Sequence, residues 1–413
     1  MLFYRIITGF YFFSVKIAAF FNPKAKLMIS GRVNWRNELK AKIDKNKSYV
    51  WIHCASLGEF EQGRPLIEKI KSENAGVSIL LTFFSPSGYE IRKNYQFADI
   101  VCYLPFDSKA NAKDFIDIVK PKYAVFVKYE IWYYFLKELS IRNIPVFLIS
   151  GIFRKNQIFF KWYGKSYRKA LSFFSHLFLQ DDKSAELLKN FGFSDYSVCG
   201  DTRMDRVMNI AGENYVNPLL EQFSENNNII VCGSTWEEDE KILCAFINEF
   251  FGKYKLIVAP HEINEKHIEK IEKLLKIKSV RLSNLKAIDD SISVIIVDSI
   301  GLLSKLYRYA KVAYVGGGFG KGIHNILEAI VYNIPVIFGP NYKKFKEAND
   351  SILAGTAFEI KHIDDLENII NKLFCNVERY VTIKNDTQKY IQKSFGATAK
   401  IYEKLQKFDK SEQ

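Results

Sequence analysis

The sequence predicts an α/β protein built from two doubly wound domains with parallel sheets. Short apolar runs alternate with helical patterns through most of the 413 residues, which is typical of βαβ units. The alternation pauses once, over residues 204–227, and then begins again. A chain of this length is also too long for a single compact core. We therefore expect two domains of similar size.

Apolar runs mark the strands, and each run has the length of a buried parallel strand. In the first lobe we expect strands over residues 48–54, 77–83, 99–103, 123–127, 145–149, 176–180 and 196–199, with helices between several of them, for example over 109–119 and 131–141. In the second lobe the runs are "NIIVCGS", "KLIVAP", "SVIIVDS", "VAYVGGG" and "IPVIFGP". Residues 386–408 form a last amphipathic helical pattern, and such a segment can cross back to the first lobe.

These patterns divide the chain into five expected parts. They are an N-terminal segment over 1–25, a first lobe over 26–205, a linker over 206–227, a second lobe over 228–385 and a C-terminal helix over 386–413.

The N-terminal segment is apolar and sits next to a basic stretch. "MLFYRIITGFYFFSVKIAAFF" is rich in aromatic residues, and residues 1–50 hold ten Lys and Arg residues against two acids. This segment is marginal for a clean membrane span, and it has no A-x-A-like cleavage site of a secretory signal. We expect an anchor that lies in or shallowly crosses an inner membrane, with the basic residues on the cytoplasmic side. The alternative is a buried N-terminal helix.

Cysteine and histidine spacing argues against a metal site. The six cysteines show no C-x-x-C spacing, and the six histidines form no H-E-x-x-H pair. A reduced compartment fits scattered cysteines. We expect neither a metal ion nor another cofactor.

Charged side chains follow three predicted strands of the first lobe. Glu59 follows "WIHCASLG", Glu130 follows "FVKY", and Arg203 follows "VCGDT". In open α/β sheets, ligands bind at the carboxyl ends of strands, and in a two-lobed protein the cleft between the lobes is the place to search. The alternative is structural, because acids are common at helix N-termini and Arg is usually a solvated surface residue.

The second lobe carries a glycine-rich turn in "YVGGGFGKGIHNILEAIVYNIPVIFGP", residues 314–340. Asn325 and Glu328 are three apart, so they share a helix face, and Glu328 could bind the two hydroxyls of a ribose. The glycine spacing is neither a dinucleotide fingerprint nor a Walker A sequence. The alternative is a tight turn without a ligand. "STWEEDEK" after another strand predicts an N-capping box from Ser234 to Glu237. Backbone N–H groups at "VAPHE" and "VDSIGLL" could line a nucleotide pocket.

Taken together, these motifs carry a resemblance. "WIHCASLGE", "YEIW", "GDTRMD", "VAPHE", "VDSIGLL" and "GGGF…GIHNILEA" fall in the order and spacing of the transferases of 3-deoxy-D-manno-octulosonic acid (Kdo), along nearly the whole chain. The resemblance implies two Rossmann-like lobes of the GT-B fold and an inverting, metal-independent transfer of Kdo from CMP-Kdo to a lipid A precursor.

The resemblance also implies roles for residues. The general base falls on Glu59, and two positions that stabilise the transition state fall on Glu130 and Arg203. The CMP contacts fall on Pro260, His261, Ile300, Gly301, Leu302, Asn325, Ile326, Leu327 and Glu328.

This chain departs from the family pattern at four places. His261 stands where Arg is frequent, and Ile300-Gly301-Leu302 stands where Met-Gly-Glu is frequent, so a backbone contact there would survive but a carboxylate contact would not. Ile326 replaces a Pro within the Asn-Pro-Leu-Glu motif. Arg203 replaces the usual Lys, which keeps the charge but changes its geometry.

The implied function is Kdo transfer in lipopolysaccharide synthesis at the cytoplasmic face of the inner membrane, with CMP-Kdo, a lipid A precursor (lipid IVA) and the anionic membrane surface as partners and no nucleic acid. One rival is another GT-B enzyme that uses a UDP-sugar, or a sugar-nucleotide epimerase. A rival from another class is a non-catalytic basic membrane-binding protein, which would have no need for acids at strand ends.

A basic and aromatic stretch in the first lobe predicts a surface for the acceptor. Residues 153–174 interleave basic side chains with Phe, Trp and Tyr and hold no acid. This composition suits an anionic membrane interface, and we assign Lys161, Lys165 and Arg168 to it. The alternative is an ordinary solvated helix face.

Overall fold

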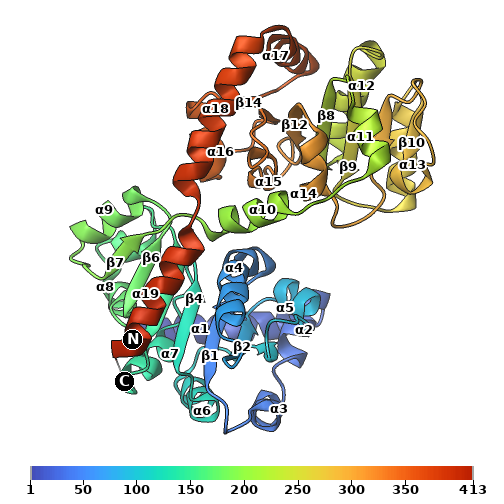
Figure 1. Cartoon of the computed structure of the whole chain (residues 1–413). Coiled ribbons are helices and arrows are strands. Elements are labelled where there is room, and N and C mark those ends of the chain that lie inside the picture. Colours follow the sequence, from blue (N-terminus) through green and yellow to red (C-terminus); the bar gives the residue numbers. More distant parts are fainter. Residues whose placement is uncertain (1, 412–413) are drawn as a thin grey trace. The chain divides into compact units, whose positions relative to one another are not determined.

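The computed structural model describes the backbone of residues 2–411 and the side chains of residues 4–165 and 167–408. The chain forms two compact units (Figure 1): the segment up to Asp205 together with the segment from Phe395 onwards is the first, and Arg206–Ser394 is the second. Met1 and residues 412–413, which the expected N-terminal segment and C-terminal helix include, lie outside the described residues.

A seven-stranded parallel sheet forms the centre of the first unit in the described part of the chain, in the order β3-β2-β1-β4-β5-β6-β7. Its strands are β1 (Tyr49–Cys54), β2 (Ser78–Phe83), β3 (Ile100–Tyr103), β4 (Tyr123–Val127), β5 (Val146–Gly151), β6 (His176–Leu179) and β7 (Tyr196–Val198). Every residue of β1 and β2 is buried, because helices cover both faces of the sheet. These are the strands that the apolar runs predict, within one or two residues at each end.

Helices connect these strands and precede them. They are α1 (Leu2–Ala18), α2 (Pro23–Ser30), α3 (Trp35–Lys42), α4 (Leu57–Glu73), α5 (Pro86–Arg92), α6 (Lys109–Val119), α7 (Tyr133–Ile141), the 3₁₀ turn η1 (Ile158–Phe160), α8 (Lys165–Leu171), α9 (Asp182–Asn190) and α10 (Thr202–Gly212). The last helix, α19 (Ala397–Ser411), buries Ala397, Ile401 and Leu405 against the side of the sheet that α4 covers.

The N-terminal helix α1 packs one face on the first unit and exposes the other. The Tyr4 hydroxyl donates a 2.5 Å hydrogen bond to Asp107, and the Phe12 ring lies 4.5 Å from the Phe106 ring. On the opposite face Phe10 is 72% exposed and Phe13 is 59% exposed. In the part of the chain that the structure describes, no single helix has the length and apolar character of a membrane span, and the bent pair Tyr4–Ala18 and Pro23–Ser30 meets that criterion only when the two are combined.

The second unit repeats the architecture with a parallel sheet in the order β10-β11-β9-β8-β12-β13-β14. Its strands are β8 (Ile229–Thr235), β9 (Lys255–Pro260), β10 (Ser279–Arg281), β11 (Val294–Ile296), β12 (Val312–Val315), β13 (Val336–Phe338) and β14 (Ala357–Glu359). Its helices are α11 (Pro218–Ser224), α12 (Glu237–Glu249), α13 (Glu265–Leu274), α14 (Leu303–Leu306), α15 (Leu327–Ile330), α16 (Lys346–Leu353), α17 (Ile363–Cys375) and α18 (Val377–Ser394), with 3₁₀ turns η2 (Leu282–Asn284) and η3 (Tyr307–Tyr309).

Three expectations about local structure need correction. Residues 206–227 group with the second unit, because most of them form the end of α10 and α11 rather than a separate linker. The expected helix over 386–408 belongs to two helices, because α18 ends at Ser394 and α19 begins at Ala397. Between them Gly396 has φ of +91°, which a helix does not allow. Ser234 is not the cap of α12, because it lies inside β8 with φ of +52°. The helix begins after Trp236, whose backbone N–H donates to the Asp239 carboxylate.

Candidate functional site

Glu59 lies in the first turn of α4, directly after β1. Its Oε2 accepts the backbone N–H of Ala55 at 2.5 Å, so the carboxylate satisfies an N–H group just before the helix. Ser56 holds the N-cap position without a side-chain hydrogen bond. The structural role that the sequence leaves open for Glu59 is therefore present, and it places the carboxylate at the carboxyl end of β1, an inner strand of the sheet.

Glu130 lies beyond the neighbouring strand β4, which pairs in parallel with β1 so that His53 is opposite Phe126. The Trp132 indole N–H donates to Glu130 Oε2 at 2.7 Å, and His53 Nε2 lies 3.4 Å from the same oxygen. The Glu130 side chain is 14% exposed, whereas His53 is completely buried. The register of two strands thus brings together residues 77 positions apart in sequence, as counted from the numbers of His53 and Glu130.

The two carboxylates influence each other. Burial raises the pKa of Glu59 to about 8, and the negative charge of Glu130 contributes to that rise. The Ala55 N–H and the Lys128 ammonium act in the opposite direction. A carboxylate whose pKa lies near neutral pH is suited to accept a proton from a hydroxyl group, which is the property of a general base.

Arg203 follows the edge strand β7 and is held by a neighbour. Its Nη2 donates to Asp201 Oδ2 at 2.6 Å, and its Nε lies 3.0 Å from the same oxygen. Thr202, the residue before Arg203, donates to the Gln62 carbonyl oxygen of α4 at 2.6 Å and lies 3.1 Å from the Ser150 hydroxyl of β5, so the start of α10 contacts α4 and β5. Asp201, for which the sequence motifs predict no role, orients the guanidinium.

Glu328 and Asn325 lie together in the second unit. Asn325 Nδ2 donates to Glu328 Oε1 at 3.1 Å, while Asn325 Oδ1 accepts the Leu327 N–H at 3.2 Å. Asn325 therefore precedes the short helix α15 rather than lying within it. Burial raises the pKa of Glu328, which Asn325 and the positive charge of Arg206 offset in part. The pair forms a polar group at the end of an otherwise apolar segment.

The other residues assigned to the nucleotide present backbone or lie at the surface. The side chains of Ile326 and Leu327 belong to the core, so only their backbone could contact a ligand. Pro260 ends β9 and is buried. Ile300 is exposed, Gly301 has φ of +87°, and Leu302 precedes α14. At these positions a ligand contact would come from the main chain.

His261 belongs to a stack of three rings that the sequence motifs do not predict. Its ring lies 4.6 Å from that of Trp236 and 4.4 Å from that of His324, and the planes are within 28° of parallel. The Trp236 indole N–H donates to His324 Nε2 at 3.0 Å. Burial, and to a smaller extent His261, lower the pKa of His324 to about 4, so this ring is neutral near pH 7. A signal for the stack exists in the sequence, since Trp236 and His261 directly follow β8 and β9, and His324 lies in the glycine-rich segment after β12.

The glycine-rich turn is packed against the protein itself. A Cβ on Gly316 would lie 2.4 Å from the Ser234 carbonyl oxygen, and one on Gly318 would lie 2.5 Å from the Gly339 nitrogen. The Gly317 N–H donates to Asp239 at 2.8 Å. These glycines are required by close backbone packing around the ends of β8, β12 and β13.

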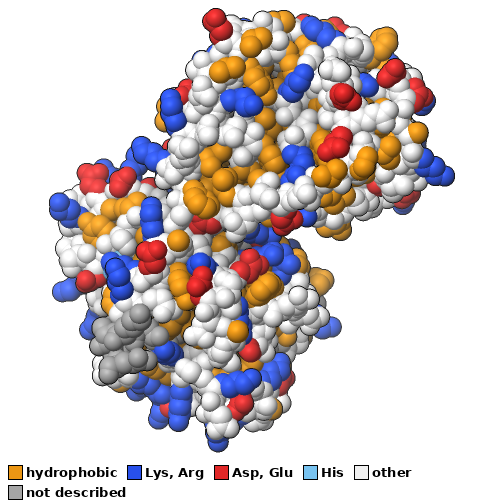
Figure 2. All heavy atoms as spheres, in the orientation of Figure 1, with side chains coloured by type: hydrophobic (Ala, Val, Ile, Leu, Met, Phe, Trp, Pro, Cys, Tyr) orange, Lys and Arg blue, Asp and Glu red, His pale blue; other side chains and the backbone are white. Residues whose placement is uncertain are grey.

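In the basic and aromatic stretch, residues 153–174, Arg168 has a structural role. Arg168 donates to the carbonyl oxygens of Phe159 at 2.7 Å and Lys161 at 2.9 Å, so it holds the loop before α8 closed. Lys165 is exposed, and Trp162 is 91% exposed. On the face drawn in Figure 2, Lys and Arg side chains are scattered over both units among Asp and Glu side chains.

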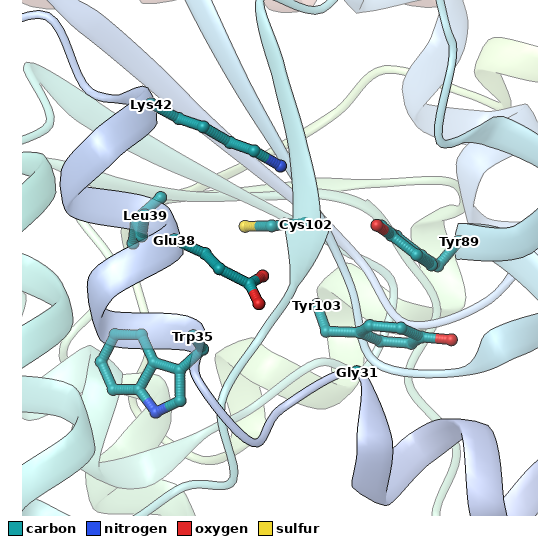
Figure 3. A pocket seen from close by; sticks show the side chains of 8 residues that line it. All are labelled: Gly31, Trp35, Glu38, Leu39, Lys42, Tyr89, Cys102 and Tyr103. Atoms are coloured by element: carbon teal, nitrogen blue, oxygen red, sulfur yellow. The ribbon is translucent and has the colours of Figure 1, made fainter.

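A small cavity of the first unit lies apart from the predicted residues. Figure 3 shows its lining of Gly31, Trp35, Glu38, Leu39, Lys42, Tyr89, Cys102 and Tyr103, which come from α3, from β3 and from segments near α2 and α5. None of these is a predicted site residue. Among the described residues, no group of three or more His, Cys, Asp or Glu side chains is arranged to hold a metal ion.

Comparisons with known proteins point to one family. Residues 31–206 match the family described as 3-deoxy-D-manno-octulosonic-acid transferase (kdotransferase). The chain is 28% identical over 357 residues to a 3-deoxy-D-manno-octulosonic acid transferase of Aquifex aeolicus, a match that covers 85% of this chain and 92% of the relative. It is 26% identical over 373 residues to a transferase of the same name from Haemophilus influenzae, with 87% of each chain covered.

Solved structures confirm the architecture. A UDP-GlcNAc 2-epimerase of Neisseria meningitidis, solved with UDP-GlcNAc, matches with a TM-score of 0.61 and 16% identity over 87% of this chain and 100% of that chain. At this identity the likeness shows the two-unit fold alone. The family match in the first unit, and the relatives that span most of the chain at 26–28% identity, together show that this chain is similar to the 3-deoxy-D-manno-octulosonic-acid transferases.

Proposed function

We propose that this protein is an inverting glycosyltransferase that moves Kdo from CMP-Kdo to lipid IVA, the lipid A precursor. The observation that carries the proposal is the pair of interacting carboxylates, Glu59 and Glu130, at the carboxyl ends of β1 and β4 in a relative of the Kdo transferases. Ligands of open α/β sheets bind at this edge.

Glu59 acts as the general base. The acceptor group is a sugar hydroxyl, which is a weak nucleophile until its proton is removed as the new bond forms. Glu59 takes that proton, and its raised pKa makes it a stronger base than an exposed carboxylate. The oxygen attacks the anomeric carbon of Kdo while the bond to the CMP phosphate breaks. Glu130 lies beside Glu59 with its negative charge available to a cation-like transition state.

The second unit holds the nucleotide. Glu328, kept in place by Asn325, accepts the ribose hydroxyls, and we assign the phosphate to the Gly301 backbone N–H and the His261 ring, since the His261 N–H already donates to the Thr235 carbonyl oxygen at 2.9 Å. The departing CMP carries less charge than a departing diphosphate. Backbone N–H groups and a small number of cations therefore suffice for it, and we propose transfer without a metal ion.

The protein binds its lipid acceptor at a membrane surface. Ile6, Phe10, Phe13 and Ile17 are exposed along one face of α1, with spacings of three and four residues. Because the other face of α1 packs on the first unit, the helix can lie in the interface with its exposed rings among the acyl chains. The ring of Tyr4 in α1 lies 6.2 Å from that of Tyr167 in α8, so the exposed Trp162 and Tyr163 belong to the same region. We place the protein at the cytoplasmic face of the inner membrane.

The direct test supplies purified protein with CMP-Kdo and a tetra-acylated lipid A precursor and measures the product mass. The expected product is heavier than the acceptor by one or more Kdo residues, with CMP released. A second measurement compares thermal protection by CMP and by UDP. Protection by UDP alone, with no transfer from CMP-Kdo, would contradict the proposal and favour an enzyme that uses a UDP-sugar.

A further inference from the structure

We infer that His53 is a positioning residue: it accepts the Trp132 indole N–H and so holds that N–H against the Glu130 carboxylate, beside the general base Glu59. This inference deepens the proposed function and rests on it for the role of Glu59. His53 occupies the fifth position of β1, inside the strand and completely buried, where an apolar residue would be expected.

A chain of hydrogen bonds fixes the His53 ring. Its Nδ1 lies 2.9 Å from Thr82 Oγ1 on the neighbouring strand β2, and the Trp51 indole N–H donates to that same hydroxyl oxygen at 2.8 Å. Its Nε2 accepts the Trp132 indole N–H at 3.1 Å and lies 3.4 Å from Glu130 Oε2, beyond the neighbouring strand β4. The ring therefore bridges three adjacent strands at the edge where the carboxylates lie.

The network assigns the ring proton. The Trp132 indole N–H donates to His53 Nε2, so the neutral imidazole carries its hydrogen on Nδ1 and donates it to Thr82 Oγ1. Thr82 in turn donates to the Ile52 carbonyl oxygen at 3.5 Å. The Trp132 N–H is shared between His53 Nε2 at 3.1 Å and Glu130 Oε2 at 2.7 Å. His53 thus fixes the indole whose N–H faces the Glu130 carboxylate.

The remaining titratable groups near the two carboxylates come from β1, from the segment after β4 and from α1: they are Cys54, Lys128, Tyr129 and Tyr11. Burial raises the pKa of Cys54, Tyr129 and Tyr11, so all three are neutral near pH 7. Lys128 favours the anion of Glu59.

The negative charge of Glu130 is one of the causes that raise the pKa of Glu59, so a contact that fixes Glu130 beside Glu59 supports the base. The Trp132 N–H, held in place by His53, makes that contact. Glu59 then exchanges a proton near neutral pH, as a base must. Without this hydrogen bond the Glu130 carboxylate is no longer fixed beside Glu59, the pKa of Glu59 falls, and Glu59 becomes a weaker base.

The test compares His53→Leu, which removes the acceptor that holds Trp132, with His53→Gln, whose amide oxygen can still accept the Trp132 N–H. His176→Leu is the matched control, since His176 is a buried histidine of the same sheet whose Nε2 pairs with the Ser197 hydroxyl at 2.9 Å. Glutamate labelled with ¹³C in the carboxyl group is titrated by NMR in each protein, and the Glu59 resonance is assigned by its loss in Glu59→Gln. The transfer rate and the CMP affinity are measured in parallel.

For His53→Leu we expect the midpoint of the Glu59 titration to fall by more than about half a pH unit and kcat to fall at least about 10-fold, with CMP affinity unchanged. His53→Gln should stay close to the wild type in both, and His176→Leu should leave the Glu59 midpoint unchanged. An unmoved midpoint in His53→Leu would overturn the inference and leave His53 a packing residue.

Two further outcomes are decisive. If His53→Leu does not fold, Trp132→Phe carries the test, because Phe keeps the ring that lies 4.6 Å from Phe84 and removes only the indole N–H. The same downward shift of the Glu59 midpoint is expected, and no shift overturns the inference. If the wild type transfers no Kdo while the midpoints shift as expected, the proposed function fails and the positioning of Glu130 by His53 stands.

Discussion

Asp205, in the first turn of α10, accepts the backbone N–H of Thr398 in α19 at 2.6 Å. Its other oxygen accepts the Gly396 N–H at 2.7 Å, and the carboxylate is buried. A residue from the end of the first half of the chain thus caps its last helix. The final acid of the "GDTRMD" motif, for which the sequence predicts no role, is what joins α19 to the first unit.

Asp205→Ala should therefore loosen α19. The substitution leaves two N–H groups at a buried helix start without an acceptor, and we expect the free energy of unfolding to fall by about 1–3 kcal/mol. Urea unfolding measures the change. Limited proteolysis should show faster cleavage near residue 395. Asp386→Ala is the control, because Asp386 forms an exposed pair with Lys389 and its loss should cost less than about 0.5 kcal/mol. Equal losses in the two variants would contradict the capping role.

Arg32 should tolerate no replacement by Lys. Its guanidinium is buried and donates to the carbonyl oxygens of Met28, Phe84 and Leu104 at 2.6–2.7 Å, and burial lowers its pKa to about 10. A lysine ammonium cannot reach three carbonyls in the geometry of a planar fork. We expect Arg32→Lys to lower the free energy of unfolding by about 3 kcal/mol. Arg36→Lys, at a half-exposed pair with Asp114, should change it little.

Glu59→Gln should lower the transfer rate and make the folded protein more stable than the wild type at high pH. The pKa of Glu59 in the folded protein, about 8, lies above the ordinary value of 4.5, so the folded state binds this proton more tightly than the unfolded chain does. Ionisation of Glu59 therefore lowers stability as the pH rises from about 4.5 through about 8. Gln removes this loss. The melting temperature of the variant, relative to that of the wild type, should therefore rise as the pH increases across that window. Its transfer rate should fall by roughly 10²–10⁴-fold.

The pH profile of the wild type gives an independent check on Glu59. The base must be ionised, so kcat/KM should rise with pH and level off above about 8. A wild-type profile that is flat between pH 6 and 9, or Glu59→Gln retaining more than about a tenth of the transfer rate, would exclude Glu59 as the base.

Glu328→Ala should weaken CMP binding. Glu328 is held by Asn325 and partly buried, so loss of its contacts to ribose hydroxyls should cost about 1–3 kcal/mol of binding free energy. Calorimetry with CMP measures this, and circular dichroism verifies the fold. Glu262→Ala is the control, because Glu262 is an exposed neighbour of His261. Equal CMP affinity in Glu328→Ala and the wild type would move the ribose site elsewhere.

Charged residues on the exposed face of α1 should detach the protein from membranes. Phe10→Asp with Phe13→Asp places two anions where we expect acyl chains, and binding to anionic vesicles in flotation should fall at least about 10-fold. Phe251→Asp, at an exposed position of the second unit, should leave it unchanged. Equal flotation of the double variant would contradict the interfacial placement of α1.

The basic residues of the loop before α8 are best tested without Arg168. That side chain closes the loop on two carbonyls, so its reversal to Glu would disturb the loop itself. The double variant Lys161→Glu, Lys165→Glu changes charge alone, and we expect it to bind anionic vesicles more weakly than the wild type does. High salt should abolish the binding of the wild type to these vesicles as well. Unchanged binding would leave this loop an ordinary solvated surface.

The sequence alone predicts both sheets and the place of both acids. Buried parallel strands read as continuous apolar runs, so β1 and β4 can be recognised from the amino-acid pattern by itself. Glu59 and Glu130 follow these runs, and the carboxyl ends of parallel strands meet at one edge. The role of His53 cannot be found in this way, because it lies inside a strand and its partners Thr82 and Trp132 are set by the register of neighbouring strands.

The same distinction holds for the second unit and for the end of the chain. Glu328 and Asn325 are close in sequence, so their pairing can be predicted from spacing, whereas the stack of Trp236, His261 and His324 depends on three strands lying side by side. The break of the last helix at Gly396 and its capping by Asp205 are hidden in an amphipathic pattern that continues through both helices. Local patterns determine which segments are strands and helices, because burial repeats with a fixed period. Contacts between distant segments depend on register and packing, and these only the tertiary structure decides.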